Sequence, residues 1–136
     1  LRRVTSVALL QTQDRHAETA GGGRVRIDAA DARHAELVAS ANAWKVLDYA
    51  GMNAATLYAS TEPCSMCAGA AYWTGIGRVV YGMSNQRLFE FTGDNPQHAS
   101  FALPCRDILT QGTRPITVVG PLLENEAAQA HEGYWH

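Results

Sequence analysis

The sequence predicts an α/β fold: a sandwich with helices on both faces of a mixed five-stranded sheet. Short β-branched, apolar runs alternate along the chain with longer segments of helical periodicity. Their expected order is β-β-α-β-α-β-loop-β-α, which places helices against a sheet. The chain has 136 residues and shows no repeat, linker or low-complexity tract, so we expect one domain over residues 1–136.

The first two strands are expected to form a hairpin. Residues 4–10, "VTSVALL", are β-branched and apolar, and residues 24–27, "RVRI", alternate polar and apolar side chains. The glycines at 21–23 lie between them and are typical of a turn region.

The first helix is expected to start at Asp31, which can cap it, and to end at "GMN", residues 51–53. Apolar residues at three- and four-residue steps predict its buried face. These residues are Leu37, Ala41, Trp44 and Leu47.

The middle of the chain predicts a strand, a helix and a second strand. Residues 55–60, "ATLYAS", are rich in β-forming residues, and Pro63 occupies a favourable first-turn position for a helix through residues 64–73. Gly75 and Gly77 end this helix, and residues 78–82, "RVVYG", read as a buried strand.

The last third of the chain begins with residues 84–105, which we expect to be a long irregular loop of the kind that often carries function. Residues 116–120, "ITVVG", predict a final strand, and Pro121 starts the final predicted helix.

Composition excludes several classes of protein. The net charge of −2 argues against a broad basic surface for nucleic acid, and no apolar run reaches the roughly 20 residues needed to span a membrane. The N-terminal "LRRVTSVALL" has no small-residue cleavage site, so we expect no secretory signal. Three cysteines do not make a disulfide scaffold, which favours the reducing cytoplasm.

Cys64 and Cys67 form a Cys-x-x-Cys pair that could be part of a zinc site, a redox couple or two small buried side chains. Structural zinc sites usually have four protein ligands, but here Cys105 stands alone and no second pair exists. This favours a three-ligand site with an open position, as catalytic sites have. His34, at the start of another predicted helix, is the expected third ligand.

Glu36 follows His34 by two residues and could move protons beside a metal ion without binding it. Residues i and i+2 point to nearly opposite sides of an ideal helix. His34 must therefore lie at an irregular first turn if both side chains are to face one site.

The composite pattern "HAE" (34–36) and "PCSMC" (63–67), within residues 31–82, resembles the cytidine deaminase-like superfamily. The similar branch contains guanine deaminases, tRNA adenosine deaminases and fungal-type cytosine deaminases. The resemblance implies one zinc ion per chain, held by His34, Cys64 and Cys67. It also implies hydrolytic release of ammonia from a nucleobase or nucleoside, with Glu36 as the proton shuttle.

The resemblance also suggests the substrate. Trp73 and Asp94 match guanine deaminases, and Tyr134 and Trp135 are compatible with a C-terminal lid, so guanine or guanosine is favoured. The hairpin asparagine that usually contacts substrate in this family has no counterpart in "GGGRVR" (21–26). The alternatives are deamination of tRNA adenosine or of cytosine or cytidine, and, in a different class, a non-catalytic zinc-stabilised binding module.

The expected partners follow from the same reading. They are a small-molecule substrate and further copies of the chain, at least as a dimer, in which each C-terminal tail could close its own active site or that of its partner; nucleic acid and membrane are not expected. Phe89 and Phe91 could line a base pocket, but packing in the core is the expected role. Structural or surface roles are expected for Cys105 and for the remaining histidines, His16, His98, His131 and His136.

Overall fold

The computed structural model describes residues 8–11, 34–94, 96 and 101–133. Over these residues the chain forms an α/β fold whose sheet has the strand order β1-β2-β3-β4. β1 runs antiparallel to β2, whereas β2, β3 and β4 are parallel. The strands are β1 (Ala8–Gln11), β2 (Thr56–Thr61), β3 (Arg78–Met83) and β4 (Thr117–Val119). The predicted strand at residues 24–27 lies outside the described residues, so the count of five strands stays a prediction.

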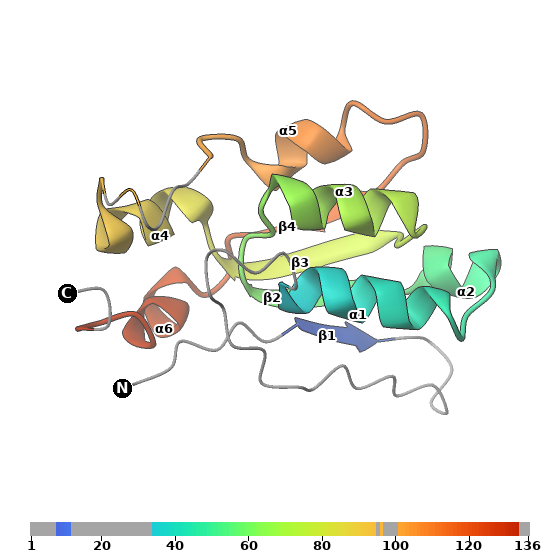
Figure 1. The fold of residues 1–136 in the computed structure, drawn as a ribbon, viewed down its shortest axis with the longest axis horizontal. Helices are drawn as coiled ribbons and strands as arrows, with labels where there is room; N and C mark the ends of the chain where they lie inside the picture. The colour runs from blue at the N-terminus through green and yellow to red at the C-terminus, as the bar shows by residue number, and fades with distance from the viewer. Residues whose placement is uncertain (1–7, 12–33, 95, 97–100, 134–136) are drawn as a thin grey trace.

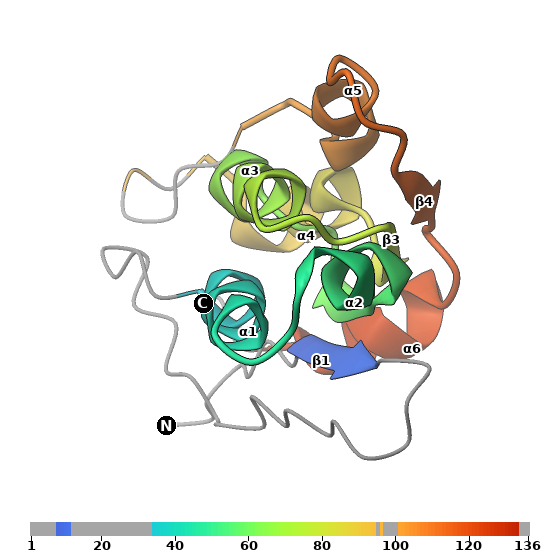
Figure 2. The ribbon, with the colours of Figure 1, turned by 90° about the vertical axis from the view of Figure 1, so that its right-hand side faces the viewer.

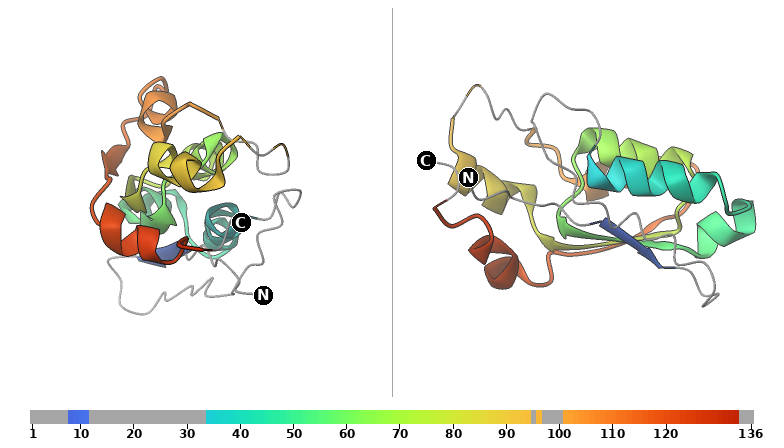
Figure 3. Two further views of the ribbon diagram at one scale, coloured as in Figure 1. Left: turned by 90° about the vertical axis from the view of Figure 1, so that its left-hand side faces the viewer. Right: turned by 60° about the horizontal axis from the view of Figure 1, so that its bottom comes forward.

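Helices lie on both faces of this sheet. Figure 2 shows α1 and α3 on one face and α6 on the other, and Figures 1 and 3 show α4 beyond one end of the sheet. None of the helices within the described ranges is long and apolar enough to cross a membrane. The helices are α1 (Ala35–Trp44), α2 (Tyr49–Ala54), α3 (Ser65–Trp73), α4 (Asn85–Thr92), α5 (Cys105–Leu109) and α6 (Glu124–Gln129).

The predicted first helix is corrected at both ends. α1 begins at Ala35, because His34 at its N-cap is extended, and it ends at Trp44. Residues 51–53, expected to end that helix, lie inside α2, which Asp48 caps by accepting a hydrogen bond from the Gly51 N–H at 2.7 Å. Asp31 lies outside the described residues.

The buried face of α1 also differs from the prediction. Trp44 is 55% exposed, and Leu37 and Ala41 are only half-buried. The buried positions are instead Ala35, Glu36, Ala39, Ser40 and Ala43. α1 packs along α3, where Ala68 and Ala71 are fully buried. Small side chains on both helices let their backbones approach closely, so the alanine stripe faces inward rather than the larger residues.

The predicted loop at residues 84–105 is wrong in its first part, which forms α4. Ser84 caps this helix by accepting from the Arg87 N–H. The final helix begins at Glu124 rather than at Pro121, because the N–H groups of Leu122 and Leu123 donate to the Gly82 carbonyl at the end of β3.

Candidate metal centre

Two helix N-termini create the site. α1 and α3 pack side by side with their N-termini at the same end (Figure 1), and His34 and Cys64 are the respective N-cap residues. Neither side chain caps its own helix. The helices therefore leave the imidazole and the thiol available to a shared site.

The structure brings the three predicted ligands together. The ligand atoms of His34, Cys64 and Cys67 all lie within 4.8 Å of one another, and within the described residues no further His, Cys, Asp or Glu joins this group. Bond lengths of about 2.0–2.3 Å place imidazole and thiolate ligands of a tetrahedral zinc ion about 3.5 Å apart. The distance from His34 Nδ1 to Cys64 Sγ is 3.5 Å. The arrangement fits zinc with one coordination position left open.

The extended backbone of His34 allows its side chain and that of Glu36 to face the same site. With φ −60° and ψ 148°, His34 lies before the first helical turn, and Glu36 is the second residue of α1. The usual divergence of residues i and i+2 in a helix therefore does not separate them.

The two cysteine thiols shift each other's pKa in opposite directions. A hydrogen bond from Cys67, with a further contribution from His34, lowers the pKa of Cys64 to about 4. The same hydrogen bond, together with burial, raises the pKa of Cys67 above its usual range. Cys64 is thus a thiolate at neutral pH, the form that binds zinc, and its position at a helix N-terminus favours that charge.

Glu36 is buried beside this cluster, with 5% of its surface exposed. Cys67 Sγ donates to Glu36 Oε2 at 3.8 Å. Burial raises the pKa of Glu36, with its own backbone hydrogen bond and His34 acting in the opposite direction. A raised pKa makes the carboxyl group easier to protonate, which favours its accepting and returning a proton in general acid–base catalysis.

Glu62 is a buried residue that the sequence reasoning missed. Its carboxylate accepts from the Cys105 N–H at 2.7 Å and from the Asn85 N–H at 2.9 Å. It joins the loop before Cys64 to the first residues of α4 and α5. The signal in the sequence was an acidic residue directly before Pro63, at the end of a strand.

Of the substrate residues suggested by the sequence, the structure describes Trp73 and Asp94. Trp73 is 82% exposed and lies at the far end of α3, about 13 Å along the helix axis from Cys64. Asp94 is exposed after α4. Tyr134 and Trp135 lie outside the described residues, so their roles stay predictions.

Of the residues expected to have structural or surface roles, some lie within the described part of the chain and others lie outside it. Cys105 is buried at the start of α5, and His131 is buried against the ring of Phe91. Phe89 is 45% exposed, which corrects its expected place in the core. His16, His98 and His136 lie outside the described residues.

Comparison with known proteins agrees with this geometry. Residues 3–83 match the family model of the cytidine and deoxycytidylate deaminase zinc-binding region. A probable cytosine deaminase of Schizosaccharomyces pombe is 46% identical over 80 residues, which cover 59% of this chain and 49% of that protein. A tRNA-specific adenosine deaminase of Haemophilus influenzae is 41% identical over 54 residues, covering 40% of this chain and 31% of that protein. The chain thus spans half or less of the length of these curated relatives.

Solved structures are similar over nearly the whole chain. The guanine deaminase from Nitrosomonas europaea has a TM-score of 0.67 at 24% identity, with 95% of this chain and 71% of that chain covered. A complex of the protein NE0047 with 2,6-diaminopurine has a TM-score of 0.64 at 26% identity, covering 95% of this chain and 69% of that chain. Because the family model covers more than half of the sequence and its zinc-binding residues converge, this chain belongs to the cytidine and deoxycytidylate deaminase zinc-binding family.

Proposed function

We propose that this chain catalyses the zinc-dependent hydrolytic deamination of a nucleobase or nucleoside, with release of ammonia. The observation that carries the proposal is the buried Glu36 carboxyl group in contact with the ligand Cys67, beside a three-ligand metal site. A purely structural zinc site needs no buried acid next to an open coordination position.

Each residue has a distinct task in this proposal. His34, Cys64 and Cys67 hold the metal ion, which when bound supplies a Lewis acid that makes water nucleophilic at neutral pH. Glu36 accepts a proton from the attacking water and delivers it to the departing amine. Water and substrate thus yield a carbonyl group on the ring and ammonia, with no change in oxidation state.

Guanine is the first substrate to assay. Structures similar to this chain over most of its length include a guanine deaminase and a complex with 2,6-diaminopurine. Cytosine is the second, favoured by the 46% identity to a probable cytosine deaminase. Both bases carry the amine on a ring carbon that is doubly bonded to a ring nitrogen, so one site chemistry serves either ring.

Ammonia release from a panel of compounds tests the proposal. Zinc-loaded protein is incubated with guanine, guanosine, adenine, adenosine, cytosine and cytidine, with chelator-treated protein as the control. We expect ammonia from at least one compound, guanine first, and none after zinc removal. Bound zinc without turnover of any compound would favour the non-catalytic binding module instead.

Two further expectations stay proposals. The net charge of −2 disfavours a tRNA substrate, and inosine analysis after incubation with tRNA tests this. A homodimer would show twice the chain mass in analytical ultracentrifugation, and a monomer would contradict it.

A further inference from the structure

Glu62 is a buried acidic residue that the proposed reaction does not use. It follows the end of β2 and precedes the metal ligand Cys64 by two residues. Only 5% of its surface is exposed. Burying a carboxylate costs free energy unless hydrogen bonds compensate for the lost water. Its burial directly before the metal ligands therefore indicates a specific role.

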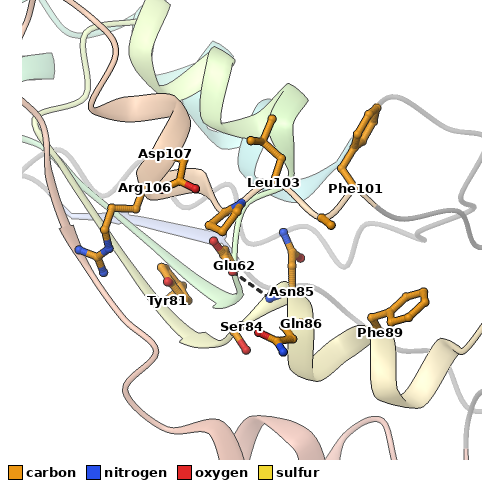
Figure 4. Close-up of a pocket in the computed structure, with 12 residues that line it drawn as sticks. Glu62, Tyr81, Ser84, Asn85, Gln86, Phe89, Phe101, Leu103, Arg106 and Asp107 are labelled. Atoms are coloured by element: carbon orange, nitrogen blue, oxygen red, sulfur yellow. Dashed lines mark hydrogen bonds between the residues drawn. The ribbon is translucent and has the colours of Figure 1, made fainter.

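Three hydrogen bonds fix Glu62. Its N–H donates to the Met83 carbonyl at the end of β3 at 2.7 Å. Its two carboxylate oxygens accept from Cys105 N–H at 2.7 Å and from Asn85 N–H at 2.9 Å, the first residues of α5 and α4. Figure 4 shows this carboxylate at the wall of a cavity of about 650 Å³, with the bond to Asn85 drawn. Glu62 thus ties the end of β2 to β3, α4 and α5.

The chain between Glu62 and Cys64 is stiff. Pro63 is the one residue between them, it is fully buried, and its ring holds φ at about −65°. The residue before a proline is itself restricted to extended backbone. Few soft dihedral angles therefore remain, and a displacement of Glu62 must move Cys64. Cys67 must follow, because Cys64 is the N-cap of α3 and Cys67 lies in its first turn.

The third metal ligand does not move with these two. His34 is the N-cap of α1, a separate helix. A shift of the α3 N-terminus relative to α1 would therefore change the distances from the imidazole to both sulfur atoms. The present distance of 3.5 Å from His34 Nδ1 to Cys64 Sγ fits a shared zinc ion.

We propose that Glu62 is a positioning residue for the metal centre. By holding the starts of α4 and α5, it fixes the two cysteine ligands at zinc-binding distance from His34. If Glu62 only joined β2 to these helices, its loss would lower stability alone. As a positioning residue it also controls zinc affinity and the geometry of the bound metal ion. The inference rests on the proposed function only in assigning this metal centre to that reaction.

Glu62→Gln tests the inference, because it keeps the size of the side chain and replaces one acceptor oxygen by a donor. Glu124→Gln is the matched control. Glu124 also accepts from a backbone N–H at the start of α4, that of the N-cap Ser84, but it lies outside the metal-binding loop. We expect both variants to lose thermal stability. Only Glu62→Gln should bind zinc more weakly, by about tenfold or more, in competition with a chromophoric chelator.

Cobalt(II) bound in place of zinc gives a second readout. Its visible absorption spectrum depends on the ligands and on their geometry. We expect an altered spectrum in Glu62→Gln and the parent spectrum in Glu124→Gln. Loss of stability in both variants, with parental zinc affinity and cobalt spectrum in each, would overturn the inference.

Hydrogen exchange in the parent protein provides a test that needs no variant to fold. Coupling between two sites is reciprocal, so zinc must favour the hydrogen bonds of Glu62 if these bonds favour zinc. Zinc should therefore slow exchange of the Asn85 and Cys105 amides more than that of the Ser84 amide, which donates to Glu124. Equal slowing of all three amides would contradict the inference.

These measurements use no substrate, so the inference and the proposed function can fail separately. If zinc affinity depends on Glu62 but the protein releases no ammonia from any base, the proposed function fails and the inference stands. Ammonia release by a protein whose zinc affinity is unchanged in Glu62→Gln is the reverse case.

Discussion

The packing of α3 against α1 determines whether the three metal ligands meet, and Ala71→Leu tests this. Cys67 contacts Glu36 of α1, and Ala71 follows Cys67 by four residues, so both lie on the same face of α3. Ala71 is fully buried. The added atoms have no room there and must force the two helices apart. This happens about one helical turn, roughly 5–6 Å, from the metal ligand Cys67.

The expected magnitude follows from the cost of overpacking a core. Ala71→Leu should lower the free energy of unfolding by about 1–3 kcal/mol. For a domain of this size that corresponds to a fall in Tm of roughly 4 °C per kcal/mol. Because the ligand atoms come from both helices, zinc affinity should also fall, by about ten- to a hundredfold.

Gly69→Ala is the matched control on the same helix. A Cβ at this position meets nothing within 4 Å. Replacing glycine within a helix should therefore stabilise the protein by about 0.5–1 kcal/mol and leave zinc affinity unchanged. Thermal unfolding and competition with a chromophoric chelator measure both quantities. A destabilised Ala71→Leu protein with full zinc affinity would refute the idea that this packing positions the ligands.

Three other predictions concern the surroundings of the site. Gly77→Ala should prevent recovery of folded protein, because the new Cβ would overlap the backbone carbonyl of Asn53 at the end of α2; a normal Tm for this variant would contradict the close approach of Gly77 to Asn53. Hydrogen bonds from Ser84 lower the pKa of Glu124, so this carboxylate stabilises the fold above its unfolded pKa and loses that contribution as pH falls through the lower folded value. Glu124→Gln should accordingly be less stable than the parent at neutral pH and equal to it in strong acid, as followed by denaturant unfolding; a difference independent of pH would argue against the linkage. Burial and Glu62 raise the pKa of Cys105 to about 12, so iodoacetamide should not label it in the folded protein, and mass spectrometry showing rapid labelling would contradict its burial.

The metal centre could be predicted from sequence because its parts are local. Cys64 and Cys67 lie three residues apart at the start of α3, and His34 and Glu36 lie two residues apart at the start of α1, so the ligand types and their spacing are visible in the chain. The α3 helix was also predicted with nearly correct bounds, because Pro63 and Gly75 mark its ends and Gly75 has a positive φ of 92°.

The surroundings could not be predicted because they depend on contacts between distant segments. The buried face of α1 consists mainly of alanines. A prediction from hydrophobic periodicity instead assigns larger apolar residues, such as Leu37 and Trp44, to the buried face. In the sequence alone, Glu62 resembles any other acidic residue. Its role depends on hydrogen bonds from Asn85 and Cys105, which lie 23 and 43 residues further along the chain. Likewise, Trp73 is close to Cys64 and Cys67 in the sequence, but it lies at the opposite end of α3 from Cys64.

In the proposed mechanism, Glu36 moves protons beside a zinc ion held by His34, Cys64 and Cys67. The most direct test of this mechanism compares zinc content and ammonia release in the parent protein and in Glu36→Gln, with the preferred base as substrate. We expect one zinc ion per chain in both proteins and a loss of turnover of about 10²–10⁴-fold or more in the variant. Turnover by Glu36→Gln at the parent rate, with zinc retained, would contradict it.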